Sequence, residues 1–342
     1  MTADPATLEV DAPATTPSTD SQRRGWRPTR LQVSLTIWAA VAGYLVFKWR
    51  VTTDRTHLFI IVGSLLVAAG AGRRDHVARL VRDWAPLFAV LMGYDLLRGQ
   101  ADQWFPVHVT PQIDADRFLF GTVPTVWLQR AMFTPGQPQW WDYLTFFVYL
   151  SHFFVAIVVA ALVWKFAYHR FHRFAALFVG LSFAGFATYA FFPAAPPWLA
   201  SQSHDLAPTA KIVDEVWVHL GLHNGASVLS ARGTFANPVA AIPSLHAAFP
   251  LLLLLFFWRS AGRWRWPLAL YPLAMAFALV YTGEHYVIDI FLGWIYAVAA
   301  YVVGLWIAAA WARRPARQAP VVPLPVAAPA PPLVEASVSS RR

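Results

Sequence analysis

Residues 242–258 read IPSLHAAFPLLLLLFFW, a proline and a histidine followed closely by a run of apolar residues. An uncharged apolar run of this kind predicts a helix that is buried in protein or in lipid. A second stretch, TGEHYVID at 282–289, leads in the same way into the apolar segment 286–311. Each stretch places a histidine at the start of an apolar segment, where water meets lipid. The two stretches therefore predict a helical membrane protein with polar residues at the membrane surface.

The overall composition agrees with this interpretation. Of the 342 residues, 57% are hydrophobic and only 13% are charged, whereas soluble domains carry about 25% charged residues. The chain has no cysteine, which excludes disulfides and metal sites built on thiolates. The net charge of +9 does not indicate a nucleic-acid partner, because the basic residues cluster in short loops between apolar runs, as membrane topology requires.

Apolar segments recur along most of the chain. They cover residues 31–48, 57–72, 83–98, 142–166, 173–192, 245–259, 267–283 and 286–311. A helical span needs about 20 residues, so the shorter segments leave a range of six to eight spans, with eight as the expectation. A backbone inside lipid must satisfy its own hydrogen bonds, and the alternating pattern of a barrel is absent from the sequence. The predicted fold is an all-α, polytopic transmembrane helix bundle.

The same pattern divides the chain into regions. We expect residues 1–30 and 313–342, which are rich in proline and small residues, to be disordered cytoplasmic tails. Residues 31–312 then form the transmembrane domain. Within it we expect accessory helices at 31–98, an extracytoplasmic loop at 99–140, and a catalytic helix bundle at 141–312.

The distribution of basic residues predicts the orientation. With both termini in the cytoplasm, most of the 27 Lys and Arg residues fall in inside segments, as the positive-inside rule requires. The loop 193–243 and the turn near residue 283 then lie outside, so His246 and His285 share the extracytoplasmic face. The Ala-, Arg- and Pro-rich composition is typical of a bacterial chain, which makes the bacterial inner (plasma) membrane the expected location.

Two histidines and one aspartate are the candidate catalytic groups. His285 and Asp289 are four residues apart, which on one helix would place them on the same face. The carboxylate could then orient the imidazole and leave its other nitrogen nucleophilic. His246 follows Pro243, which suits the first turn of a helix, and Ser244 could cap that helix or donate to substrate; His246 could protonate a leaving group. The alternative is that these are interfacial residues which cap or pair within the bundle.

These residues resemble a known family. Pro-Ser-Leu-His at 243–246, followed by His-Tyr-Val-Ile-Asp at 285–289, is similar to motifs of the type 2 phosphatidic acid phosphatase superfamily, and most similar to its inositol phosphorylceramide synthase branch. The Pro-rich run FPAAPPW at 192–198 resembles a segment of that branch. The resemblance covers about 140–312. It implies a mechanism without a metal or other cofactor, in which His285 attacks phosphorus, Asp289 orients it, and His246 protonates the leaving alcohol.

The chain departs from the phosphatase pattern where that pattern binds phosphate. Leu245 replaces a glycine, Ala278 and Leu279 stand where a Ser-Arg pair is expected, and the Lys and Arg-Pro of the first phosphatase motif have no match. The usual cationic clamp is therefore missing, which favours the transferase branch.

Other residues are therefore needed to bind the substrate. A phosphate charge must still be offset; our candidates are Arg232, in the outside loop before His246, and Lys211 as a weaker one. Each could instead be a solvated loop charge. His152 lies inside a predicted span, where a titratable group is expected to be functional. It could line the substrate cavity near Tyr149, or could be a hydrogen-bonded residue of the bundle.

The expected function is an enzyme that moves a phosphoryl or phospho-headgroup unit, such as phosphoinositol, from a phospholipid to a hydroxyl acceptor. Its expected partners are membrane lipids, and the oligomeric state is left open. The first alternative is hydrolysis of a lipid phosphate or polyprenyl diphosphate by the same three residues. A metal site made of two histidines and an aspartate, and a non-catalytic transporter or scaffold, are further alternatives.

Overall fold

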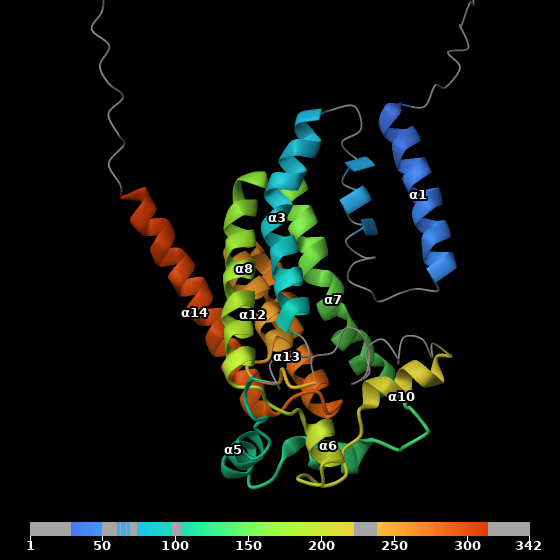
Figure 1. Ribbon diagram of the computed structural model, residues 1–342, viewed down its shortest axis with the longest axis vertical. Coiled ribbons are helices and arrows are strands. Elements are labelled where there is room, and N and C mark those ends of the chain that lie inside the picture. Colours follow the sequence, from blue (N-terminus) through green and yellow to red (C-terminus); the bar gives the residue numbers. More distant parts are fainter. Residues whose placement is uncertain are drawn as a thin grey trace, which may run out of the picture.

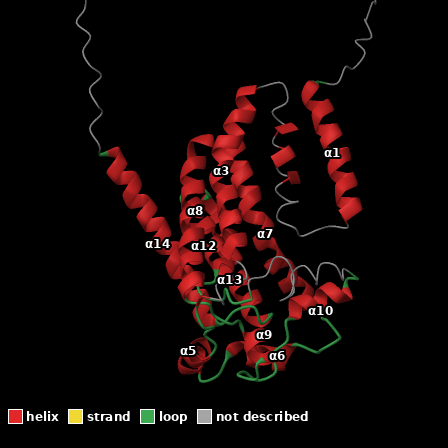
Figure 2. Ribbon diagram, in the orientation of Figure 1, coloured by secondary structure: helices red, strands yellow, loops and turns green. Residues whose placement is uncertain are grey.

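The computed structural model describes residues 29–49, 60–61, 63–65, 67–68, 74–97, 104–221 and 238–313. Helices and loops make up these residues, and extended pairing between them is limited to isolated bridges at His108, Ala194 and Ala240 (Figure 2). The prediction of an all-α fold is confirmed. The predicted tails lie almost entirely outside the described residues, as does most of the predicted segment 57–72.

All but the first of the long helices form a bundle, the first stands beside it, and shorter helices gather at one end of the bundle (Figure 1). The long helices are α1 (Arg30–Trp49), α3 (Arg74–Leu97), α7 (Trp140–Phe166), α8 (Tyr168–Phe191), α12 (Leu245–Phe257), α13 (Arg265–Tyr281) and α14 (Val287–Ala312). The shorter ones are α5 (Thr110–Phe120), α6 (Pro124–Met132), α9 (Pro197–Gln202) and α10 (Ile212–His219), with a 3₁₀ turn at Gly262–Trp264.

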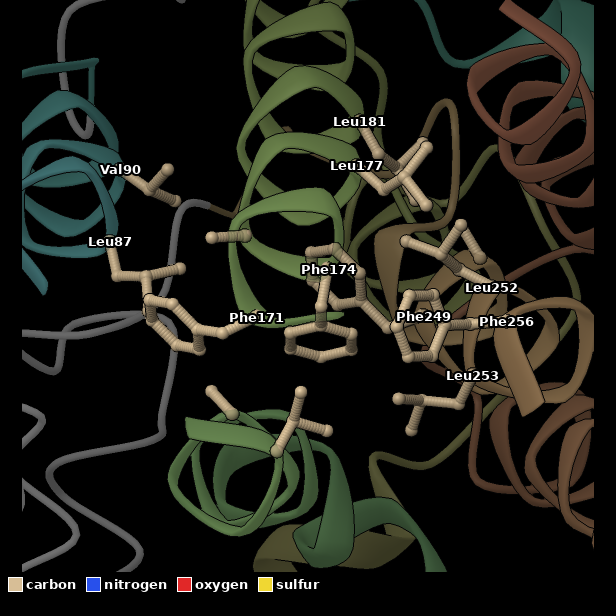
Figure 3. Close-up of a cluster of buried hydrophobic side chains, with 14 of the residues drawn as sticks. Leu87, Val90, Phe171, Phe174, Leu177, Leu181, Phe249, Leu252, Leu253 and Phe256 are labelled. Atoms are coloured by element: carbon tan, nitrogen blue, oxygen red, sulfur yellow. The ribbon is translucent and has the colours of Figure 1, made fainter. Parts of the chain in front are cut away.

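Helix α12 lies at the centre of the bundle and packs against α7, α8, α13 and α14. Its sequence is apolar on every side, which is typical of a helix that is buried all round. Leu252, Leu253 and Phe256 of α12 belong to one continuous apolar core with side chains of α3 and α8 (Figure 3). Leu252 and Leu253 of the leucine run at 251–255 are thus part of this core.

Among the described residues, three helices, α7, α8 and α14, are long and apolar enough to cross a membrane. Helix α12 has 13 residues and α13 has 17, fewer than the roughly 20 of a full span. Within the described part of the chain, the expected count of about eight spans is therefore not confirmed. What is established is a helical bundle with several membrane-length helices.

The short helices α5, α6 and α10 lie at the end of the bundle where α12 and α14 begin (Figure 1). Backbone hydrogen bonds hold the connecting loops together there. The Pro-rich run contributes the central strand-like segment: Ala194 donates to Val239 and accepts from Ala241, while Pro193 accepts from His108. Segments far apart in the sequence therefore form one cap over the starts of α12 and α14.

Candidate active site

The side chains of His246, His285 and Asp289 form a connected row. Nδ1 of His285 lies 3.3 Å from Oδ2 of Asp289, and Nε2 of His285 lies 3.4 Å from Nδ1 of His246. His285 and Asp289 are buried. His285 thus stands between a carboxylate and a second imidazole, one partner on each ring nitrogen. The structure brings the three predicted catalytic residues together, while their chemical role stays a prediction.

The contact between His285 and Asp289 arises differently from our expectation. We predicted a pair on one face of a helix, but α14 begins at Val287 and Tyr286 has an extended backbone, so His285 precedes the helix and that prediction is wrong. Asp289 is in the first turn, where its Oδ2 accepts the backbone N–H of Tyr286 at 2.9 Å. A carboxylate in this capping position turns back toward the start of the helix, and so reaches the His285 ring.

His246 is placed by a capped helix start. Helix α12 begins at Leu245, and the Ser244 hydroxyl accepts from the N–H of Ala247 at 3.3 Å. Ser244 is therefore the N-cap, and the prediction that Pro243 occupies the first turn is wrong because Pro243 precedes the cap. The Ser244 hydroxyl is buried and used by the helix. A part for it in substrate binding remains a prediction.

Direct backbone packing joins the starts of α12 and α14. The Ser244 N–H donates to the Asp289 carbonyl at 3.1 Å. At Gly293, one turn further along α14, an added Cβ would lie 2.3 Å from the Ser244 carbonyl oxygen. Only a glycine permits this approach, which sets the distance between the elements that carry His246 and His285.

The leucine that replaces the family's glycine also has a packing role. The side chain of Leu245 lies over Gly185 of α8, where an added Cβ would come within 2.9 Å of it. Nearby, the Tyr189 hydroxyl donates to the Pro243 carbonyl at 2.7 Å. Helix α8 therefore fixes the loop that leads into His246.

Helix α7 supplies the aromatic surroundings of His246. The ring of Tyr149 stacks on that of His246 with centroids 5.3 Å apart, and the ring of His152 lies 4.0 Å from it. Both predicted substrate-binding residues of α7 thus border the candidate site. Their position is consistent with contact to a substrate, and that role stays a prediction.

Lys211 lies beside the turn that carries His285. Its ammonium is 3.5 Å from Asp214 and 4.0 Å from Glu284, the residue before His285, and lies 5.1 Å from the centre of the Trp198 ring. Burial raises the pKa of the Glu284 carboxyl, and the charge of Lys211 opposes that rise. Lys211 is thus partly neutralised by two acids. The other cationic candidate, Arg232, lies outside the described residues.

Two polar residues that sequence reasoning missed hold this end of the bundle together. Asp116 of α5 is buried and accepts the N–H groups of Val287 and Ile288, at 3.1 and 3.0 Å. The pKa of the Asp116 carboxyl is raised to about 6, chiefly by burial and also by the charge of Asp289, against the two N–H donors, which lower it. Asp116 therefore caps the start of α14 from another segment.

Gln129 of α6 is the second missed residue. Its amide nitrogen donates to the carbonyls of Ala210 and Tyr281 at 2.9 Å each, and its amide oxygen accepts from the N–H of Ala210 at 2.8 Å. These bonds hold the chain before α10 against the end of α13. The partners of Asp116 are 171 and 172 residues away in the sequence, and those of Gln129 are 81 and 152 residues away. No local pattern could therefore have indicated these contacts.

Within the described ranges, no group of three or more His, Asp or Glu side chains is arranged to hold a metal ion. In the candidate site His285 lies between the other two residues, so the three side chains form a row.

Comparison with known protein families gives a match over the region that contains His246, His285 and Asp289. The family model of the PAP2 superfamily matches residues 113–303, more than half of the chain. The chain therefore belongs to the PAP2 superfamily, and with its membrane-length helices it is a multi-pass membrane protein.

A more specific likeness covers a shorter region. A phosphoinositol dihydroceramide synthase of Bacteroides thetaiotaomicron is 36% identical over 129 residues, which are 35% of this chain and 41% of that relative. The match thus spans less than half of the relative's length. No solved structure matches the chain.

Proposed function

We propose that this protein is a membrane lipid phosphotransferase that moves a phospho-headgroup from a phospholipid to the hydroxyl group of a second lipid. The observation that carries the proposal is the row His246–His285–Asp289, with one partner on each nitrogen of His285. A carboxylate on Nδ1 orients the ring and leaves Nε2 as the nucleophile. Membership of the PAP2 superfamily supports phosphorus as the atom attacked.

The reaction has two balanced steps. In the first, Nε2 of His285 forms a bond to phosphorus, the bond from phosphorus to the donor's alcohol oxygen breaks, and His246 gives that oxygen a proton. In the second, an acceptor hydroxyl gives its proton to His246 and attacks phosphorus, and the bond to His285 breaks. General acid-base catalysis of this kind contributes about 10²–10⁴ in rate.

The name of the Bacteroides relative supports a particular headgroup. We propose phosphoinositol as the unit transferred, phosphatidylinositol as the donor, and a long-chain amide alcohol such as dihydroceramide as the acceptor. Lys211 and Arg232 are the proposed partners of the phosphate charge, and Tyr149 and His152 the proposed neighbours of the acceptor. Water in place of the acceptor would give a phosphatase, which the family membership equally supports.

The test is a product analysis with purified protein. Phosphatidylinositol labelled in both the inositol ring and the phosphate is incubated with and without dihydroceramide. We expect both labels to enter one new lipid only when the acceptor is present. Release of both labels as water-soluble inositol phosphate, with no new labelled lipid when the acceptor is present, would refute transfer and establish hydrolysis by the same row.

Variants of the row test whether it is the reaction centre. We expect His285→Ala to abolish turnover and Asp289→Asn to lower it by roughly 10²-fold or more. Matched controls are His169→Ala, an exposed histidine at the other end of α8, and Asp114→Asn, an exposed carboxylate on α5. Lipid turnover that survives both row variants would mean that this site is not catalytic.

A further inference from the structure

Behind His152 an apolar cavity runs into the bundle, away from the end that carries the candidate active site. The cavity has a free volume of about 70 Å³. Because one water molecule needs roughly 10–15 Å³ of such volume, the cavity has room for several groups of that size. Side chains of four helices line it: Trp84 and Leu87 of α3, His152, Phe153, Ala156, Ile157 and Ala160 of α7, Phe174 and Phe178 of α8, and Phe249 of α12. Apart from the His152 imidazole and the Trp84 ring N–H, the lining offers no polar side-chain atoms.

One lining residue of the cavity, His152, is in contact with the candidate active site. The His152 ring lies 4.0 Å from that of His246 and 5.5 Å from that of Phe249. From there His152, Ala156 and Ala160 follow one another at intervals of four residues along one face of α7, over about 12 Å. The two alanines leave the space that larger side chains would fill. One end of the cavity therefore lies at His152, next to the proposed general acid, and the lining continues along α7 to Ala160 in the apolar core.

Helix α3 closes one side of this cavity. In Figure 3, Leu87 of α3, Phe174 of α8 and Phe249 of α12 lie around the same space between the helices. Trp84 packs on Phe171 of α8 with ring centroids 6.0 Å apart. The matched family region starts at residue 113, so α3 is a feature of this chain outside that region.

A buried aspartate anchors α3 in this position. Asp83, next to Trp84, accepts hydrogen bonds from the indole N–H of Trp164 at 3.1 Å and from the Tyr168 hydroxyl at 2.8 Å. Its other oxygen accepts from Arg82 at 3.0 Å. Because the buried Asp83 carboxylate accepts hydrogen bonds from side chains of both α7 and α8, it fixes the rotation of α3 about its own axis. In this orientation Trp84 and Leu87 face the cavity.

We propose that this cavity holds one hydrocarbon chain of the lipid substrate, and that Trp84 of α3 and Ala160 of α7 limit the length of that chain. The inference rests on the proposed function, because it needs a lipid whose reacting hydroxyl or phosphate lies at His246. An apolar lining matches an alkyl chain, and each methylene it buries contributes about 0.8 kcal/mol, which is about fourfold in selectivity. A chain too long for the cavity loses that contribution.

The test is a competition between chain lengths, with turnover measured in one mixture. In one arm dihydroceramides of short, medium and long acyl chains compete for one donor; in the other, phosphatidylinositols of the same three lengths compete for one acceptor. If the cavity substitutions change the ratios of turnover between chain lengths in only one arm, the lipid varied in that arm is the one that enters the cavity. We expect Ala160→Leu to shift selectivity toward the shorter chain, and Trp84→Ala toward the longer chain, by about fourfold per methylene. The matched control is Ala187→Leu, at an exposed position of α8.

The ratio of turnover between chain lengths distinguishes a change in selectivity from a loss of folding. A misfolded variant lowers turnover of all chain lengths alike and leaves the ratio unchanged. Unchanged ratios in both arms for both cavity variants, with turnover present, would overturn the cavity proposal and leave the proposed function standing.

Cross-linking decides the question even if no lipid is turned over. An alcohol of about eight carbons with a terminal diazirine, whose extended length matches the roughly 12 Å from His152 to Ala160, should label the peptides that contain Ala156, Ala160 or Trp84. Ala160→Leu should reduce that labelling and Ala187→Leu should not. Labelling confined to outward-facing residues of α14 would refute the site.

Discussion

Replacing Asp116 by asparagine should change how the free energy of unfolding depends on pH. In the folded protein the Asp116 carboxyl of α5 is buried and accepts hydrogen bonds from the N–H groups of Val287 and Ile288. Burial raises its pKa from 3.8 to about 6, a difference that corresponds to about 3 kcal/mol. Asparagine has the same shape and does not titrate, so the comparison isolates the proton.

The sign follows from which state binds the proton more tightly. Because the pKa is higher in the folded than in the unfolded chain, the stabilising contribution of Asp116 is complete below about pH 3.8 and is lost as the pH rises through about 6. Asp116→Asn should therefore gain stability relative to the unchanged protein by about 3 kcal/mol as the pH is raised over this window. This change with pH is superimposed on a loss of about 1 kcal/mol that is the same at every pH, because the amide oxygen of asparagine replaces only one of the two accepting oxygens.

Thermal unfolding of the purified protein in detergent, followed between about pH 4 and pH 7, measures this difference. At roughly 2–4 °C per kcal/mol, the midpoint of the variant should rise by about 6–12 °C relative to the unchanged protein across the series. Asp114→Asn is the control, since that carboxylate is on the same helix and is 70% exposed. Equal pH profiles for the two variants would show that burial does not govern Asp116.

Two further substitutions test the packing that places His246. Gly293→Ala should lower turnover by roughly tenfold or more and destabilise the fold by about 1–3 kcal/mol, because its Cβ would lie 2.3 Å from the Ser244 carbonyl oxygen. Gly180→Ala on α8, where an added Cβ meets nothing within 4 Å, should be neutral or stabilising in the same unfolding assay. Tyr189→Phe removes the donor to the buried Pro243 carbonyl and should cost about 1–3 kcal/mol; an unchanged unfolding midpoint would show that this bond does not hold the loop.

Much of the candidate site could be predicted because its residues act within short stretches of chain. A serine two residues before a histidine at the start of an apolar run indicated a capped helix, and Ser244 caps α12. The spacing of His285 and Asp289 indicated their contact, which is present. The reason given for that contact was wrong, because sequence spacing does not say where a helix begins. Asp289 reaches His285 from the capping position of α14, which starts two residues after the histidine.

By itself the sequence determined a helical membrane protein, the pairing of two histidine stretches at the starts of apolar helices, and the family to which those stretches point. Hydropathy, capping and motif spacing are properties of neighbouring residues, so they can be read along the chain. Only the tertiary structure decided that Asp116 caps α14, that Gly293 lies against Ser244, and that α3 walls a cavity behind His152. These contacts join residues far apart in the chain, and they depend on how the helices pack and rotate against one another, which no local pattern specifies.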